Sequence, residues 1–203
     1  ANLLSETATP RYLWRIQIST GKIMYHKAFN QGLPGAYSFG TFLRFVDYDS
    51  TTLFGLYNYQ VNGSYYQRCL AKINKVTGDT TQTLLIGTSY YTNGVVTDDQ
   101  NNLIVWNDSI LTKYNRFNTN DVLWRKNLST ALPNSADQIN HAYLNAEGQL
   151  ILLGRKTVGS NYHTVFKINP QTGNIIWSTK IESTFLLTGV NFKRMKEDDD
   201  YLY

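Results

Sequence analysis

Cysteine and charge are both scarce in this sequence, and each scarcity excludes a class of protein. Cys69 is the one cysteine among 203 residues, which excludes an internal disulfide framework and a cysteine-rich zinc site. Charged residues make up 17% of the chain, and the formal net charge of +4 is spread over single lysines and arginines. Modules that bind nucleic acid concentrate basic charge on one face, so we expect no nucleic-acid partner. The sequence also lacks an apolar run of about eighteen residues, so we expect no membrane insertion.

Aromatic and small polar residues take the place of the missing charge. The chain has 15 Tyr, 9 Phe and 4 Trp, together with many Asn and Thr. Tyrosine, threonine and the other aromatics favour strands, and asparagine favours turns. This composition predicts an all-β protein with many short hairpins. Low charge combined with Asn, Thr and Tyr is also typical of exported, cell-surface and virion proteins.

One pattern recurs about every fifty residues: an apolar strand, an acidic or amide turn, and a second apolar strand. It is seen in "FVDYDSTTLFGL", "VVTDDQNNLIVW" and "AYLNAEGQLILL". The first leucine after the turn is Leu53, Leu103 or Leu150, and Tyr201 stands at the next expected place, in "KEDDDYLY". Calcium loops need oxygen ligands at alternating positions and usually a glycine. We therefore interpret the acidic run Glu197–Asp200 as a hairpin turn and not as a metal site.

A second pattern, out of phase with the first, is a strand with one basic residue, a turn, and a strand with an aromatic residue. Its copies are "WRIQISTGKIMY", "AKINKVTGDTTQ", "TKYNRFNTNDVLW" and "FKINPQTGNIIW". The turn residues that tolerate a positive φ are Gly21, Gly78, Asn120 and Gly173. The aromatic residues that follow them are Tyr25, Trp124 and Trp177, and the second copy has Gln82 instead. We expect these aromatics to pack between neighbouring sheets.

Together the two patterns make a unit of four strands, which is what a β-propeller blade requires. The sequence predicts a single β-propeller domain or propeller segment over residues 1–203. Its parts are a half blade (11–29), blades at about 39–86, 89–129 and 137–181, and a second half blade (186–203). The half blades supply complementary strands, so we expect either a closed four-bladed propeller or part of a larger one.

The string "KINPQTGNIIW" resembles the repeat of the quinoprotein-like (PQQ-like) β-propellers, whose blades end in a strand, an "LD-x-x-TG" turn and a strand with Trp. The resemblance covers all four turn regions. The family's usual Asp is replaced here by Gln17, Asn74, Asn115 and Asn169. The resemblance implies the repeat architecture. It does not carry over the redox activity, because no calcium or quinone ligand of the family can be placed in this chain.

The basic residue of the second pattern recurs once per unit, at Arg15, Lys72, Lys113 and Lys167. In a propeller such residues form a ring, which can gather an anion, a polyanionic glycan or a protein partner. The alternative is four solvated side chains on polar strand faces. The histidines His26, His141 and His163 lack metal-ligand spacing, and no G-x-S-x-G motif frames a serine. We therefore assign no catalytic, cofactor-binding or metal-binding residue.

These observations predict a non-enzymatic β-propeller that acts as a structural or binding module of a larger assembly. The expected partners are other protein subunits and a surface glycan. The composition favours a phage virion, as a tail, fibre or decoration protein, or a bacterial surface protein, and hence a virion or extracellular location. One alternative is an exported quinoprotein-like enzyme, or a fragment of one, with bound calcium or quinone. Another is a periplasmic assembly scaffold.

Overall fold

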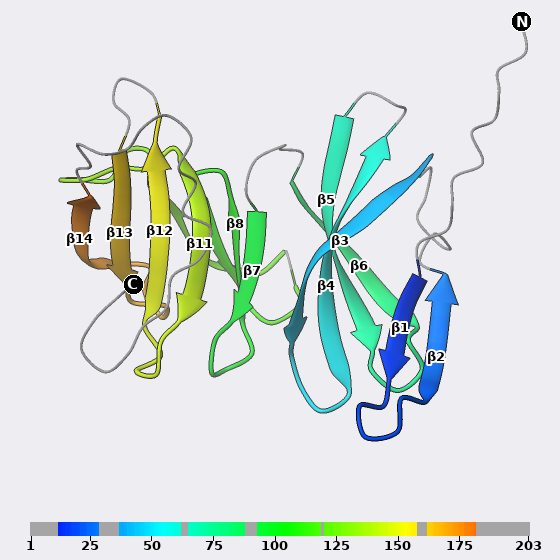
Figure 1. Ribbon diagram of the computed structural model, residues 1–203. Coiled ribbons are helices and arrows are strands. Elements are labelled where there is room, and N and C mark those ends of the chain that lie inside the picture. The colour runs from blue at the N-terminus through cyan, green and yellow to red at the C-terminus, as the bar shows by residue number, and fades with distance from the viewer. Residues whose placement is uncertain are drawn as a thin grey trace, which may run out of the picture. The chain divides into compact units, whose positions relative to one another are not determined.

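The computed structural model is all-β in the part of the chain that it describes (Figure 1). The described residues are 12–28, 37–61, 65–87, 93–118, 120–157 and 162–181. They belong to two compact units, Ala1–Tyr90 and Tyr91–Tyr203. Within these ranges all regular elements are strands, and none is a helix of the length and apolarity needed to cross a membrane.

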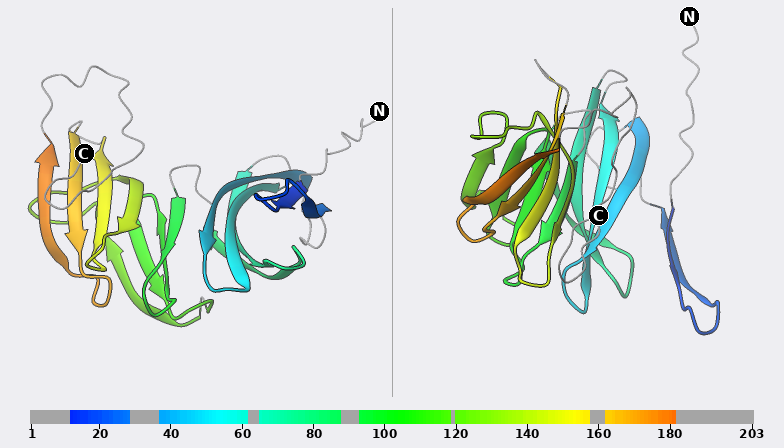
Figure 2. Two further views of the ribbon diagram at one scale, coloured as in Figure 1. Left: turned by 60° about the horizontal axis from the view of Figure 1, so that its bottom comes forward. Right: turned by 60° about the vertical axis from the view of Figure 1, so that its left-hand side comes forward.

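The first unit contains a hairpin and a four-stranded antiparallel sheet in the order β3-β4-β5-β6. The hairpin consists of β1 (Tyr12–Ile16) and β2 (Ile23–Ala28). The sheet consists of β3 (Tyr37–Asp47), β4 (Thr52–Val61), β5 (Tyr65–Asn74) and β6 (Thr80–Gly87), and it curls strongly (Figure 2). Leu13 of β1 packs against Cys69, Ala71 and Ile73 of β5, so the hairpin lies against this sheet.

The second unit contains two four-stranded antiparallel sheets, in the orders β7-β8-β9-β10 and β11-β12-β13-β14. The strands of the first are β7 (Asn93–Thr97), β8 (Leu103–Asn107), β9 (Ile110–Tyr114) and β10 (Val122–Asn127). Those of the second are β11 (Gln138–Leu144), β12 (Leu150–Lys156), β13 (Tyr162–Ile168) and β14 (Ile175–Ile181). Strand β11 contacts β7 and β8, as Figure 1 shows, so the two sheets are neighbours.

A shared apolar core joins the two sheets of the second unit. Ile104 and Trp106 of β8 belong to the same buried cluster as Leu152 of β12 and Phe166 of β13. In β13, Phe166 and Ile168 are buried, whereas Lys167 between them is only half-buried. This alternation is the period of a strand with one face on the core. Burial of apolar side chains is the main source of stability for such a pair of sheets.

The predicted all-β class and the predicted four-stranded antiparallel sheets are confirmed. The described sheets span residues 12–28, 37–87, 93–127 and 138–181. The predicted half blade at 186–203, with the acidic run in "KEDDDYLY", lies outside the described residues. A propeller is one way to arrange sheets of this kind, and it stays a prediction.

Three hairpin turns between the third and fourth strands of a repeat have the same geometry. The φ angles are 67° at Gly21, 75° at Gly78 and 72° at Gly173, in the region that favours glycine. In each turn the glycine N–H donates to the carbonyl four residues earlier, over 2.8 Å. Asn74 shows why an amide can replace the family's Asp here: its Oδ1 accepts hydrogen bonds from the N–H groups of Val76 and Thr77.

The fourth predicted turn is one residue longer and has a different geometry. The N–H of Asn120 donates to Asn118 Oδ1 over 3.1 Å, and Arg116 has a φ of 51°. The residue at 119 is outside the described part of the chain. Asn115 N–H donates to the Asp121 carbonyl over 2.9 Å, which closes this turn as the corresponding bond closes the others.

Candidate functional site

The acidic and amide residues of the first pattern act on their own turns. Asp98 Oδ1 accepts hydrogen bonds from the N–H groups of Gln100 and Asn102, at 3.0 and 2.8 Å. Asn145 Oδ1 accepts one from Gln149 N–H at 2.8 Å. Because carboxylate and amide oxygens cap backbone N–H groups here, they hold the turns closed. Among the described residues no group of three His, Cys, Asp or Glu side chains is placed to hold a metal ion.

Lys113 of β9 is buried and makes three polar contacts. Its Nζ lies 2.6 Å from Asp98 Oδ2, and both side chains are 1% exposed. The same Nζ donates to the Pro170 carbonyl at 2.9 Å and to Gln171 Oε1 at 3.0 Å. An ammonium group has three N–H bonds, so these partners can satisfy all of them. Two contacts go to the turn between β13 and β14, so Lys113 ties one sheet to the next.

The pKa of Asp98 reflects this environment. Burial alone raises the pKa of the carboxyl group, but the hydrogen bonds from Lys113 and Asn102 outweigh burial and lower it. Asp98 is therefore ionised in the folded protein at neutral pH. A buried carboxylate beside a buried ammonium avoids the cost of an isolated charge.

Trp124 of β10 contacts the same turn between β13 and β14 as Lys113 does. Its Nε1–H donates to the Pro170 carbonyl over 2.9 Å, the same oxygen that Lys113 reaches. Its ring lies against Gly173: a Cβ at this position would be 2.9 Å from Trp124 Cδ2. Glycine is thus required twice at 173, for its positive φ and for the approach of the indole.

The first unit repeats the contact with different side chains. Arg15 of β1 donates from Nη1 to the Lys75 carbonyl over 2.9 Å, and Lys75 follows Asn74 as Pro170 follows Asn169. Tyr25 of β2 lies against Gly78, where a Cβ would be 2.5 Å from Tyr25 Cε2. We call this arrangement the docking contact. A cation and an aromatic residue of one sheet, the docking pair, meet a carbonyl and a glycine in the turn of the next sheet.

The remaining members of the predicted sets occupy different surroundings. Lys72 lies half-buried on β5, opposite Gln82 of β6. Lys167 of β13 binds Glu147 Oε2 at 2.9 Å, and its cross-strand neighbour Trp177 is 42% exposed. The expectation of solvated basic side chains is wrong for Lys113, since both faces of β9 are covered. Two of the four charges, on Lys113 and Lys167, are matched by carboxylates, and the predicted anion-binding ring stays a prediction.

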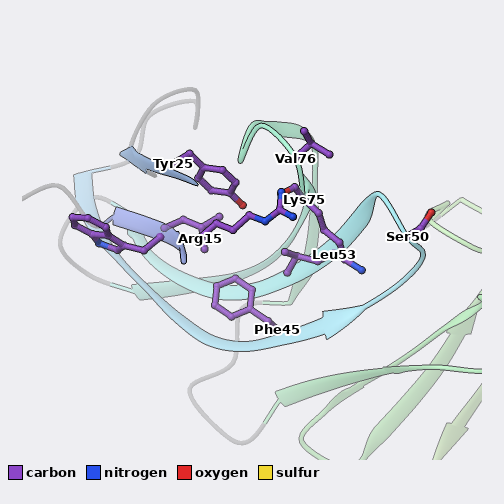
Figure 3. A pocket seen from close by; sticks show the side chains of 9 residues that line it. Arg15, Tyr25, Phe45, Ser50, Leu53, Lys75 and Val76 are labelled. Carbon is purple, nitrogen blue, oxygen red and sulfur yellow. The ribbon is translucent and has the colours of Figure 1, made fainter. Parts of the chain in front are cut away.

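A groove of about 420 Å³ opens beside the docking contact of the first unit (Figure 3). In Figure 3 the Tyr25 hydroxyl and the Phe45 ring both point towards the Arg15 side chain. Burial raises the pKa of Tyr25, and the nearby charge of Arg15 partly opposes that rise. The residues that line the groove are Leu13, Trp14, Arg15, Tyr25, Phe45, Ser50, Leu53, Lys75 and Val76. The set holds two cations and no acidic side chain, and both cations donate to backbone carbonyls, Arg15 to that of Lys75 and Lys75 to that of Asp49.

Some of these residues could be identified from the sequence and others could not. The repeats pointed to Arg15, Tyr25, Lys113 and Trp124, because each stands at a fixed position of the sequence repeat. The acceptors, which are the Lys75 and Pro170 carbonyls, were missed, since a backbone acceptor leaves no trace in residue type. The place of Lys75 and Pro170 immediately after the turn Asn is the signal that could have found them.

No family model matches this chain, and no match to it is found among curated proteins. The resemblance to quinoprotein-like propellers therefore rests on the repeats of the chain itself, and it stays a prediction. So do the virion, phage and extracellular assignments. The docking contact is the feature from which a function can be argued.

Proposed function

We propose that this chain is a non-enzymatic repeat protein of the β-propeller type that serves as a structural module of a larger assembly. The observation that carries the proposal is the docking contact, which occurs at equivalent repeat positions in both units. Arg15 and Tyr25 make it in the first unit, and Lys113 and Trp124 make it in the second. A contact that is repeated with different side chains holds each sheet in a fixed position against its neighbour. A rigid scaffold needs such contacts.

The chemistry of the docking contact supports a scaffold over an enzyme. Lys113 is the one lysine buried among the described residues, and its donors are directed at a carboxylate and at the next turn. Asp98 is directed at its own turn and at Lys113. These groups hold the fold together, so they are not available to act on a substrate. The tyrosine, asparagine and threonine content suits contacts with other subunits, in a phage virion or on a bacterial surface.

The test has two arms, one for location and one for activity. In the first, virions or cell-surface assemblies from the source culture are banded on a density gradient. The position of the chain in the gradient is detected with an antibody. We expect it to band with the particles. A chain that stays at the top of the gradient, without bound protein, would contradict a role in an assembly.

In the second arm, the purified chain is supplied with calcium and pyrroloquinoline quinone, and reduction of an artificial electron-accepting dye is followed with a panel of alcohols and sugars. We expect no dye reduction above that of the cofactor alone. Dye reduction that depends on the protein would establish the quinoprotein alternative and overturn the proposal.

A further inference from the structure

The last sheet of the second unit carries a cation and an aromatic residue in the same arrangement as the docking pair Lys113 and Trp124. Lys167 and Trp177 face each other across β13 and β14, as Lys113 and Trp124 do across β9 and β10. Lys167 is held by Glu147 at 2.9 Å, an acidic residue from a turn of its own sheet, as Asp98 holds Lys113. The difference lies in burial: Trp177 is 42% exposed, and its neighbour Ile176 is 51% exposed.

The first unit carries a turn of the matching kind. Gly21 has a φ of 67° and donates its N–H to the Gln17 carbonyl over 2.8 Å, as in the two docked turns. A Cβ added at Gly21 meets nothing within 4 Å, whereas one at Gly78 or Gly173 meets an aromatic ring. Lys75 and Pro170 supply the accepting carbonyls of the two docked turns. Ile18 stands at the equivalent position of this turn, and its side chain is fully exposed.

We propose that Lys167 and Trp177 of one copy dock onto the Gln17–Gly21 turn of a second copy of this chain. This inference rests on the proposed function as a structural module. In the contact the Trp177 ring covers Gly21, and its Nε1–H donates to the Ile18 carbonyl. The Lys167 ammonium group, still paired with Glu147, reaches the same carbonyl.

Both sides of the contact gain from docking. Trp177, Ile176 and Ile18 are large apolar side chains exposed to water, and a buried tryptophan is among the residues that contribute most to interfaces. Lys167 keeps its carboxylate partner, so docking leaves no unpaired buried charge. The two surfaces are different and lie on one chain, so the interface is head-to-tail. Interfaces of this type build rings or filaments, which fits a module of an assembly.

The experiment measures self-association by sedimentation velocity at about 1 to 100 μM protein, a range that spans moderate affinities. We expect the wild-type chain to associate as its concentration rises. Trp177→Ala and Gly21→Val are each expected to weaken association at least tenfold. The matched control, Leu132→Ala, is expected to leave it unchanged. Leu132 is a large apolar side chain that is 85% exposed.

Mixing the two variants gives the decisive result. Trp177→Ala keeps the turn and Gly21→Val keeps the docking pair, so an equimolar mixture should form a 1:1 dimer that grows no further. This result also shows that both variants are folded. A wild-type chain that stays monomeric, or a mixture that does not pair, overturns the inference.

The two proposals fail in different ways. Loss of self-association overturns the docking of copies, while banding with particles still supports the proposed function. Dye reduction overturns the proposed function, and the sedimentation results are independent of it.

Discussion

Lys113 and Asp98 form a buried ion pair, with Nζ 2.6 Å from Oδ2 and each side chain 1% exposed. Removal of one partner leaves an uncompensated charge in the interior. We expect Lys113→Met to lower the free energy of unfolding by about 3 to 5 kcal/mol, as for other buried pairs that lose one member. Equilibrium urea denaturation of the full chain measures this change.

The repeat supplies the control for this substitution. Asn145 occupies the place of Asp98 in the next sequence repeat, and its Oδ1 accepts the same kind of turn hydrogen bond. Asp98→Asn should therefore keep the turn while it removes the charge. We expect the double variant Lys113→Met/Asp98→Asn to be more stable than Lys113→Met alone. Equal stability would show that the buried charge is not what makes the single substitution costly.

Gly173 and Gly148 provide a matched comparison, because both have a φ of 72°. Alanine at either position carries the backbone strain of a left-handed residue, about 1 to 2 kcal/mol. At Gly173 the new methyl group would also lie 2.9 Å from the Trp124 ring, whereas at Gly148 it would meet nothing within 4 Å. We expect Gly173→Ala to be the more destabilising of the two by thermal unfolding, and comparable losses would contradict close packing of the indole on this turn.

The strands and turns could be predicted from the sequence because each is decided by a few neighbouring residues. Alternation around Phe166 and Ile168 gives a strand, and glycines such as Gly78 mark turns that need a positive φ. The predicted positions of Tyr25 and Trp124 followed from the repeat, and the structure places both against turn glycines.

Burial of Lys113 could not be predicted, because alternation assigns a residue to a strand face but not what covers that face. Leu111, Thr112 and Lys113 are all buried in β9, since both faces of this inner strand are covered. The groove was missed for a related reason. Phe45 and Val76 are far apart in the sequence, and Arg15 meets both only because the β1–β2 hairpin packs against the folded β3–β6 sheet.

His163 of β13 gives the stability of the protein a pH dependence. Burial lowers its pKa, and the positive charge of Arg155 lowers it further. The unfolded chain therefore binds a proton more readily than the folded protein does. Its contribution to stability is full above the usual histidine pKa of about 6.5 and falls as the pH drops towards the lower folded value.

Urea denaturation between about pH 7.5 and 5 measures this dependence, and His163→Gln should make the curve flatter. His26→Gln is the control, because His26 is exposed and stacks on Trp14. A curve that keeps its slope in His163→Gln would assign the pH dependence to another group.

Arg15 anchors the β1–β2 hairpin through its hydrogen bond to the Lys75 carbonyl. Further anchors of the hairpin among the described residues are Leu13, the Tyr25 ring and the exposed ion pair of Lys27 with Asp79. Arg15→Ala removes one hydrogen bond, which is worth about 0.5 to 1.5 kcal/mol. Because the hairpin has two strands and the neighbouring sheet has four, we expect the hairpin to open locally before the sheet does.

Amide hydrogen exchange followed by mass spectrometry separates local opening from global loss of stability. In Arg15→Ala the amides of residues 12–28 should exchange about two- to thirteenfold faster, which is the factor that a loss of about 0.5 to 1.5 kcal/mol gives, while those of β4 and β5 keep their wild-type rates. Lys22→Ala, an exposed cation of the same hairpin, is the control and should leave both sets unchanged. Equal acceleration in β4 and β5 would show that the hairpin and the sheet open as one unit, and that the Arg15 contact stabilises both.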